Sequence, residues 1–395
     1  MTAALLNPLV TRLSPPPIPA VQAWGKSYPG SLGPLIDLSQ AVPGYPPHPD
    51  MLRWLGEAAA SLDYTNYGPI EGETPLREAY AAHVSQLYGA KIVGGNIHIT
   101  SGCNQAFICA VMAVAAAGDT VLMSDPFYFN HETTLSMLGI KTGFVTCESA
   151  DGFVPNVEAV ERALTPGVRA LALVTPNNPT GAIYPPAQLK AIFDICRKNG
   201  IWLILDETYR DFLPEGFGAP HGLLAEKNWQ DNLIQLYSFS KSFCIPGHRL
   251  GALTAAENVV EEIAKIMDNL QICAPRAVQG AVARALPALA EWRAGNRLEI
   301  EARAKALREV MTDLGDWRLE AVGAYFAFIR HPFEGHASTE VAEFLAKRAG
   351  ILAIPGEYFG AQYTRFLRFA FANADAPTIR QLRGRMQDFH VGADQ

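Results

Sequence analysis

The stretch "ALALVTPNNPTGAIYPPAQLKAIFDICRKNGIWLILDE", residues 170–207, decides the fold class of this chain. It begins and ends with an apolar run of strand length. Between the two runs, Leu189, Ile192 and Phe193 recur at helical spacing, and Gly200 marks the end of the helix. A helix between two buried strands is typical of a parallel sheet, so the stretch predicts an α/β fold.

The same alternation of short apolar runs and helical stretches extends on both sides. We expect strands at 96–100 ("NIHIT"), 120–126 ("TVLMSDP") and 232–238 ("NLIQLYS"), and a helix at 104–118 ("NQAFICAVMAVAAAG"). Past about residue 285 the pattern changes to a long helical stretch at 291–315 and strand-like runs at 324–330 and 365–373. The pattern predicts a large domain with a mostly parallel sheet and a smaller α+β domain.

The change of pattern divides the chain into three segments. We assign residues 46–285 to the large domain, residues 286–395 to the small C-terminal domain, and residues 1–45 to an N-terminal arm that belongs with the small domain. The arm is rich in proline and glycine. We expect it to wrap over a neighbour.

The composition argues against several classes of function. With 395 residues and 49% hydrophobic composition, the chain is long enough to bury a large core. A formal net charge of −7 without a long basic run argues against nucleic acid as a main partner. Six cysteines without a CxxC pair indicate free thiols in a reducing compartment.

Targeting and metal signals are also missing from the sequence. The N-terminus has no basic region before an apolar run, and no apolar run reaches membrane-spanning length. We therefore expect a cytoplasmic protein without a membrane partner. The nine histidines lack metal-ligand spacing, so no metal site is expected.

Polar residues cluster where the predicted strands end, which is the edge at which parallel sheets bind ligands. Ser101 and Gly102 follow one strand, and Asn178 follows another. Asp206 ends a third, and Lys241 comes just after a fourth. A lysine at the end of a buried strand is costly unless the chemistry of the site needs it.

One part of this cluster is suited to a phosphate group. Gly102 allows a tight turn before a helix, so the backbone N–H groups of Cys103 and Asn104 would point at an anion. Ser238 and Arg249 could add a hydroxyl and a guanidinium donor to the same phosphate.

The remaining polar residues fit the ring of a phosphorylated aromatic aldehyde, pyridoxal phosphate. Lys241 would form a Schiff base with the aldehyde. Asp206 would keep a pyridinium nitrogen protonated, and Tyr209 and Asn178 would donate hydrogen bonds to the phenolate oxygen. The ring would then act as an electron sink.

Seven motifs, in this order, carry a resemblance to a known family. They are "YGPIEGETPLREAY" (67–80), "TSGCNQAF" (100–107), "DPFYFNH" (125–131), "TPNNPTG" (175–181), "DETYRDF" (206–212), "SFSKSFCIPGHRLG" (238–251) and "RFLRFAFAN" (365–373). Over nearly its whole length the chain resembles the class I/II aminotransferases of the fold-type I pyridoxal-phosphate enzymes. The resemblance implies an α/β fold whose large domain has a mostly parallel seven-stranded sheet between helices, with a smaller α+β domain.

The resemblance also implies roles for single residues. Lys241 is the Schiff-base lysine and then the acid/base for the proton shift, with Asp206 at the pyridine nitrogen. The other cofactor contacts that it implies are Asn178 and Tyr209 at the ring hydroxyl, Gly102, Cys103, Asn104, Ser238 and Arg249 at the phosphate, and Tyr128 stacked on the ring.

The resemblance further assigns substrate and partner contacts. Tyr67 is similar to the tyrosine that reaches a phosphate in the other subunit, which implies a homodimer with shared active sites. Arg368 is expected to clamp the substrate α-carboxylate, with Arg365 as the competing choice. Ala41 stands where the family usually has glycine, close to the substrate. Aromatic residues that could line the substrate pocket or simply pack in the core are Trp24, Tyr64 and Tyr363.

Two reactions remain open on this scaffold. The first is transfer of an amino group between an L-amino acid and a 2-oxo acid. The second is β-elimination by a C–S lyase. A ligand-binding regulator would need a DNA-binding domain, for which there is no room before residue 45, and the chain lacks the GxGxxG of a nicotinamide-dependent dehydrogenase.

Overall fold

A computed structural model describes residues 4–392. Its largest sheet has seven strands in the order β2-β8-β7-β6-β5-β3-β4, and only β8 runs antiparallel to its neighbours. The prediction of a mostly parallel seven-stranded sheet is confirmed. The strands are β2 (Ile97–Thr100), β3 (Thr120–Asp125), β4 (Lys141–Thr146), β5 (Val168–Val174), β6 (Trp202–Asp206), β7 (Leu233–Ser238) and β8 (Gly251–Thr254).

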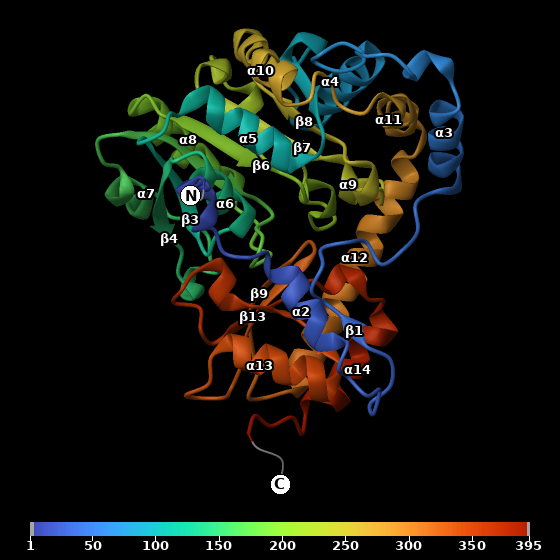
Figure 1. Cartoon of the computed structure of the whole chain (residues 1–395), viewed down its shortest axis with the longest axis vertical. Helices are drawn as coiled ribbons and strands as arrows, with labels where there is room; N and C mark the ends of the chain where they lie inside the picture. The colour runs from blue at the N-terminus through green and yellow to red at the C-terminus, as the bar shows by residue number, and fades with distance from the viewer. Residues whose placement is uncertain (1–3, 393–395) are drawn as a thin grey trace.

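Helices cover both faces of this sheet (Figure 1). On one face lie α5 (Cys103–Val114), α6 (Phe129–Met137) and α10 (Glu257–Leu270). On the other face lie α3 (Pro49–Ala59), α4 (Thr74–Tyr88), α7 (Val157–Ala163), α8 (Pro186–Lys198) and α11 (Arg276–Ala288). Side chains alternate along the strands: Leu171 and Leu173 of β5 pack on the α4 face, whereas Ala170 and Ala172 pack on the α5 face.

One predicted boundary is wrong. The helix expected to end at Gly118 ends four residues earlier, at Val114, because Ala115 takes an extended conformation (φ −139°, ψ 146°). Gly118 instead lies in the turn before β3, with φ +92°, and its N–H donates to the carbonyl of Gly139 (2.9 Å). The alanine run therefore leaves the helix before the glycine is reached.

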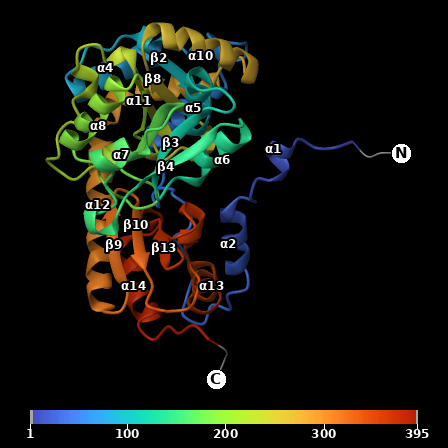
Figure 2. The ribbon, with the colours of Figure 1, turned by 90° about the vertical axis from the view of Figure 1, so that its left-hand side faces the viewer.

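A second, smaller layer lies below the large sheet in Figure 1. It has a four-stranded antiparallel sheet in the order β12-β13-β10-β9. Its elements are α12 (Ala290–Asp313), β9 (Arg318–Gly323), β10 (Phe326–Arg330), α13 (Ser338–Phe344), β12 (Ile354–Pro355), β13 (Phe366–Phe369) and α14 (Ala376–Met386). The long helix α12 runs from the large part of the molecule along the small one (Figure 2).

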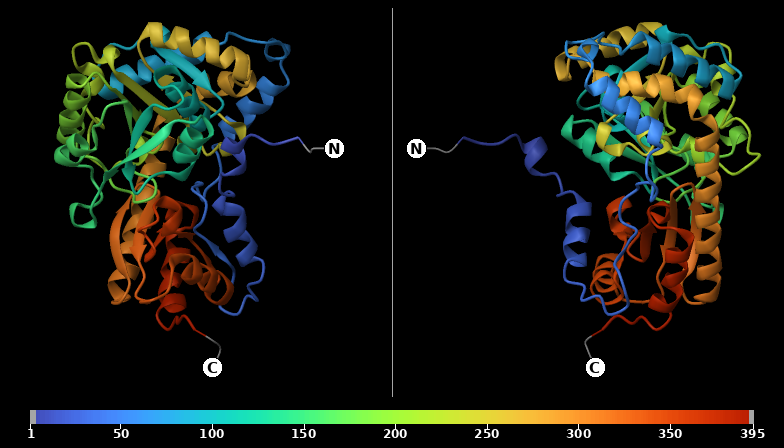
Figure 3. Two further views of the ribbon diagram at one scale, coloured as in Figure 1. Left: turned by 60° about the vertical axis from the view of Figure 1, so that its left-hand side comes forward. Right: turned by 90° about the vertical axis from the view of Figure 1, so that its right-hand side faces the viewer.

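The N-terminal segment lies beside the small sheet. Strand β1 (Ile36–Asp37) pairs in parallel with β11 (Ile351–Leu352), which supports grouping the arm with the small domain. The segment also carries α2 (Pro17–Gly25), and the described residues before α2 reach up beside α6 and then extend outward (Figure 3). Helix α1 (Pro8–Thr11) on that extension buries none of its residues. The domain boundaries at 45/46 and 285/286 stay predictions.

The chain direction brings the ends of β5, β6 and β7 to one edge of the large sheet, facing the small sheet. Polar residues end two of these strands, Asp206 in β6 and Ser238 in β7. Within residues 4–392, no helix is both long and apolar enough to cross a membrane.

Candidate active site

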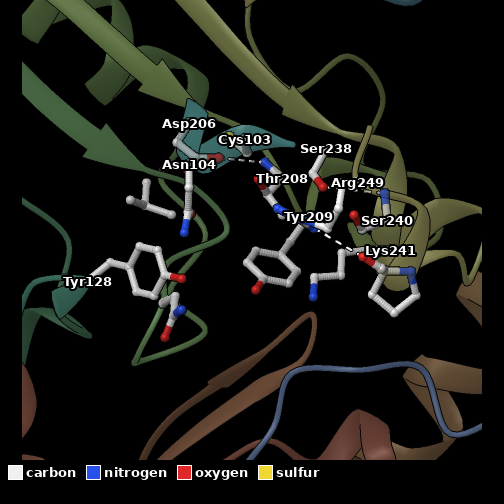
Figure 4. Close-up of a pocket in the computed structure, with 13 residues that line it drawn as sticks. Cys103, Asn104, Tyr128, Asp206, Thr208, Tyr209, Ser238, Ser240, Lys241 and Arg249 are labelled. Atoms are coloured by element: carbon white, nitrogen blue, oxygen red, sulfur yellow. Dashed lines mark hydrogen bonds between the residues drawn. The ribbon is translucent and has the colours of Figure 1, made fainter. Parts of the chain in front are cut away.

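A pocket of about 210 Å³ lies at this edge of the sheet (Figure 4). Residues from α5, the strand ends and the segment around α9 (Phe239–Ser242) surround it. Its lining is Cys103, Asn104, Tyr128, Val174, Asn178, Asp206, Thr208, Tyr209, Ser238, Ser240, Lys241, Pro246 and Arg249. The structure therefore gathers around one cavity residues that the sequence separates by up to about 150 positions.

Lys241 lies in α9, a helix of four residues that begins directly after β7. The hydroxyl of Ser238 caps this helix by accepting a hydrogen bond from the N–H of Ser240 (3.3 Å). Lys241 Nζ donates to the carbonyl oxygen of Ala41. Burial, and then the nearby charges of Arg249 and Arg368, lower the pKa of Lys241 to about 8. The amine is therefore far easier to deprotonate than an exposed lysine.

Several hydrogen-bond donors gather at one end of the pocket. Helix α5 begins at Cys103, so its first N–H groups have no acceptor within the helix. Gly102 precedes it with φ +87°, and a β-carbon there would collide with the guanidinium of Arg249. The hydroxyl of Ser240 is buried and makes no hydrogen bond. Helix N–H groups, a guanidinium and an unpartnered hydroxyl together form a donor set for a phosphate.

The pocket also holds a buried carboxylate. Asp206 Oδ1 accepts a hydrogen bond from the N–H of Thr208 (2.9 Å), and Oδ2 lies 3.4 Å from His131 Nε2. Burial alone would raise the pKa of Asp206, but His131 and Thr208 bring it below its ordinary value. The ring of His131 is stacked on Phe107 with a centroid separation of 3.7 Å, which fixes the histidine beside the carboxylate.

A buried arginine enters from the small sheet. Arg368 of β13 is 2% exposed, and its Nη1 donates to Asn178 Oδ1 (3.1 Å) while Nη2 donates to the carbonyl of Ser39. Burial lowers the pKa of Arg368 to about 10. Arg365, the competing choice, turns away: it lies 3.3 Å from Glu334 and donates to the carbonyl of His331 (3.0 Å). The structure therefore places Arg368, and not Arg365, against a pocket residue.

The adjacent asparagines Asn177 and Asn178 have different surroundings. The side chain of Asn177 is engaged within its own turn, where it donates to Tyr184 Oη (3.1 Å) and accepts from Thr180 Oγ1 (2.9 Å). Asn178 instead faces Arg368 and lines the pocket. Only Asn178 is therefore in position to contact a ligand.

Two tyrosines provide aromatic walls. Tyr209 is buried, and its ring lies 5.0 Å from Phe326 of the small sheet, centroid to centroid. Tyr128 precedes α6, and its hydroxyl accepts a hydrogen bond from Asn130 Nδ2 (2.7 Å). Burial raises the pKa of Tyr128 to about 12, so its hydroxyl stays protonated at neutral pH.

Four aromatic residues considered from the sequence do not line this pocket. Tyr67 is 78% exposed. Tyr64 stacks near Arg276, 5.5 Å from the guanidinium, in a different cavity. Tyr363 packs in the core against Phe366, and Trp24 packs between the hydrophobic cores of the two parts. Ala41 reaches the site through its carbonyl oxygen.

Three polar residues of the site were not among the predicted site residues. They are His131, Thr208 and Ser240. His131 is the last residue of the motif "DPFYFNH", and Ser240 directly precedes Lys241. The motifs could be recognised in the sequence, whereas the contacts of these two side chains depend on the fold. Among the described residues, no cluster of histidine, cysteine, aspartate or glutamate is arranged to hold a metal ion.

Comparison with known sequences defines the class of protein. The profile described as "Aminotransferase class I and II" matches residues 34–386. The chain therefore belongs to the class I and II aminotransferases, a family that depends on pyridoxal phosphate, and the expected family is confirmed.

Similar proteins carry aminotransferase names. The chain is 29% identical to "Aromatic aminotransferase ISS1" of Arabidopsis thaliana over 89% of each chain. It is 28% identical to "Aspartate aminotransferase" of Sulfurisphaera tokodaii over 88% of each chain. A solved double mutant of the aspartate aminotransferase of Thermus thermophilus is 25% identical, with a TM-score of 0.89 over 98% of this chain and 99% of that one. These names favour transamination, and none of them supports β-elimination.

The residues present fit the cofactor of this family. The unpartnered Ser240 hydroxyl and the Gly102 turn under Arg249 suit a phosphate. The buried carboxylate of Asp206 suits a protonated ring nitrogen. Lys241 lines the same pocket with an easily deprotonated amine, as attachment to an aldehyde requires.

Proposed function

We propose that this chain moves an amino group between an L-amino acid and a 2-oxo acid, with pyridoxal phosphate attached at Lys241. The observation that carries the proposal is the position of Lys241. Its amine, with a pKa of about 8, lines one pocket with the carboxylate of Asp206 and the guanidinium of Arg249. This combination supports a site for a ligand that has a basic ring nitrogen, an aldehyde and a phosphate.

In this proposal the residues at the pocket have separate roles in the reaction. Lys241, with a neutral Nζ, would hold the cofactor through its aldehyde, and the same amine would accept and return the proton that transamination moves. Asp206 would pair with a protonated pyridine nitrogen, and His131, 3.4 Å from its Oδ2, would keep that carboxylate oriented. Pyridoxal phosphate, when bound, supplies an electron sink for the charge left on the substrate carbon.

The other polar residues orient the two small molecules. Arg249, Ser238, Ser240 and the first N–H groups of α5 would bind the phosphate. Tyr209 and Asn178 would donate to the ring hydroxyl, and Tyr128 would stack on the ring.

The substrate α-carboxylate would bind at Arg368. This guanidinium is buried and already held by Asn178 and by the carbonyl of Ser39. A planar fork of donors in a fixed position matches the two oxygens of a carboxylate. The backbone at Ala41 would pass close to the substrate, as its carbonyl contact with Lys241 supports.

We further propose a homodimer with shared active sites. Tyr67 is 78% exposed and lies in a loop that touches the segment before α11, where the N–H of Gly68 meets Cys273 Sγ (3.5 Å) and Arg276 binds the carbonyl of Asn66 (2.9 Å). Exposed apolar side chains flank this loop, among them Leu62 (83%) and Ile272 (36%). A second copy of the chain would cover them and bring Tyr67 to its phosphate.

We also infer that the protein works in the cytoplasm. All six cysteines are free, and five of them are buried. Unpaired buried thiols support a reducing compartment.

The function is tested by following the reaction of the purified protein with pyridoxal phosphate. Borohydride reduction and peptide mass spectrometry should find the cofactor on Lys241. An amino acid should then yield its keto acid and the amine form of the cofactor, and a 2-oxo acid should reverse the change. Release of pyruvate and ammonia from a cysteine-type substrate without an acceptor, in place of this exchange, would show β-elimination. Lys241→Ala should abolish turnover, and near-normal transamination by this variant would refute the assignment.

A further inference from the structure

A buried polar cluster lies behind the pocket, on the other face of the large sheet. Because side chains alternate along strands, Asp206 and Ser238 face the pocket while their neighbours Glu207 and Tyr237 face α4. We call the residues on that face the rear cluster; they are Tyr80, Tyr88, Glu207, Arg210, Asp211 and Tyr237.

Within the rear cluster, Glu207 and Arg210 lie 4.0 Å apart, and both side chains contact tyrosines of α4. Glu207 accepts a hydrogen bond from Tyr88 Oη (2.7 Å). Arg210 donates to Tyr80 Oη (3.1 Å) and its guanidinium lies 4.0 Å from the ring centroid of Tyr237. These contacts fix α4 against the sheet, and they do not reach the pocket.

Asp211 makes a different connection. It lies two residues after Tyr209, in the short helix η4 (Arg210–Phe212), and its Oδ2 accepts a hydrogen bond from Tyr237 Oη (2.6 Å). Tyr237 Oη also lies 2.8 Å from Ser242 Oγ. Since the single proton of Tyr237 goes to the carboxylate, Ser242 must donate to Tyr237. A chain of two hydrogen bonds therefore links the segment of Tyr209 to the residue next to Lys241.

A second set of contacts, through Arg293, also connects Asp211 to the segment after Lys241. Asp211 Oδ1 lies 3.4 Å from Arg293 Nη1, and the guanidinium of Arg293 lies 5.3 Å from the ring centroid of Phe243. Phe243 directly follows α9, so Asp211 reaches the lysine segment from two sides. Arg293 belongs to α12, the long helix that leads along the small part of the molecule (Figure 2).

Neither of the two segments joined in this way can hold its own shape. Helix α9 has four residues and η4 has three, and isolated helices of that length are not stable in water. The relative positions of Tyr209 and Lys241 must therefore come from tertiary contacts. Asp211 is suited to the task because its side chain is only 13% exposed. Burial would raise the pKa of Asp211, but the charges of Arg293 and Arg210 keep it below its ordinary value, so the carboxylate is ionised.

We propose that Asp211 is a positioning residue that, through Tyr237 and Ser242, holds Lys241 in register with Tyr209. The proposal rests on the proposed role of Lys241 and adds a residue that lines no part of the pocket. Its prediction is a loss of rate rather than of substrate binding, because reacting groups displaced by a fraction of an ångström still bind their ligands but react slowly.

The test uses the holoenzyme and three variants, Asp211→Asn, Tyr237→Phe and Ser242→Ala. The matched control is Tyr80→Phe, which removes a buried hydroxyl from the same cluster but leaves the link from Asp211 to Ser242 intact. We expect kcat to fall on the order of 10- to 100-fold in Asp211→Asn and Tyr237→Phe, with KM for the amino donor little changed. Tyr80→Phe should lose thermal stability but keep its kcat.

Two further measurements separate positioning from plain structural damage. The pH midpoint for the absorbance of the lysine-linked cofactor should move in Asp211→Asn and Tyr237→Phe, and stay in Tyr80→Phe. The effects of Tyr237→Phe and Ser242→Ala should not add in the double variant, because both break the same chain. Ser242→Ala removes a single hydroxyl and carries the test if Asp211→Asn does not fold.

The outcomes are distinct from those for the proposed function. If the wild-type protein links no cofactor to Lys241, the proposed function fails and this inference fails with it. If the wild type links the cofactor, but the three variants lose only stability and keep their kcat and pH midpoint, the positioning role of Asp211 is wrong and the proposed function stands.

Discussion

Replacing Arg368 by alanine gives the sharpest test of how the substrate is held. Arg368 is 2% exposed, and its guanidinium is fixed by Asn178 and by the carbonyl of Ser39. With a pKa of about 10, it remains about 99% charged at pH 8. The arginine can therefore offer a carboxylate two donors without first ordering its side chain.

The size of the effect follows from these contacts. A hydrogen bond to a charged group contributes about 1.5 to 3 kcal/mol, so losing two costs at least about 3 kcal/mol. At about 1.4 kcal/mol per factor of ten, kcat/KM for an amino acid should fall on the order of 100-fold or more in Arg368→Ala. Arg368→Lys should give an intermediate loss, because it keeps a charge but not the planar fork.

The assay compares an amino acid with the matching amine that lacks the carboxylate. Conversion of the cofactor to its amine form is followed by absorbance in single half-reactions. Arg368→Ala should lose rate with the amino acid and far less with the amine. Arg365→Ala is the matched control, because it removes an arginine three residues away whose partners are Glu334 and the carbonyl of His331. Thermal melts of each variant show whether the cavity left by the missing side chain has lowered the stability of the fold.

A second readout comes from Lys241. The charge of Arg368 is one of the causes that lower the pKa of Lys241, after burial and Arg249. Its removal should raise that pKa above about 8, so cofactor attachment should need a higher pH. The reasoning is refuted if Arg365→Ala shows the selective loss and Arg368→Ala does not, or if Arg368→Ala slows the amine as much as the amino acid.

Three further predictions concern the cofactor and the assembly. Asp206→Ala should lose most activity because an unprotonated ring is a weak electron sink, and wild-type rates would remove Asp206 from the ring nitrogen. Attachment of pyridoxal, which lacks the phosphate, should speed up as the pH rises through about 8, the pKa of Lys241. Arg249→Ala should move the midpoint of this pH dependence upward, because it removes a neighbouring positive charge. An unchanged midpoint would contradict the electrostatic cause. Mixing Tyr67→Ala subunits with Lys241→Ala subunits should raise activity above that of either parent, toward about half of wild type per mixed dimer, because one site of a mixed dimer carries both defects and the other neither. An active monomer, or mixtures that stay inactive despite proven subunit exchange, would rule out shared sites.

The fold class follows from local patterns in the sequence. Leu189, Ile192 and Phe193 repeat at the helical period between two apolar runs, and such a period survives whatever the helix packs against. The same holds for the turn at Gly102 and for the order of the motifs, which together indicate the family and the pocket residues at the strand ends. Helix boundaries depend on smaller differences in free energy than the helical period does. The helix predicted to reach Gly118 ends at Val114 for that reason.

The contacts inside the site were decided by the tertiary structure alone. Asn177 and Asn178 are the same residue type, so the sequence does not distinguish them. In the fold, the side chain of Asn177 binds within its own turn, and Asn178 faces Arg368. His131 lies 75 positions before Asp206 in the sequence, yet the packing of α6 on the sheet brings the two side chains to 3.4 Å. Chemistry at a site depends on distances between side chains, and residues far apart in the chain acquire those distances only when the sheet and its helices have packed.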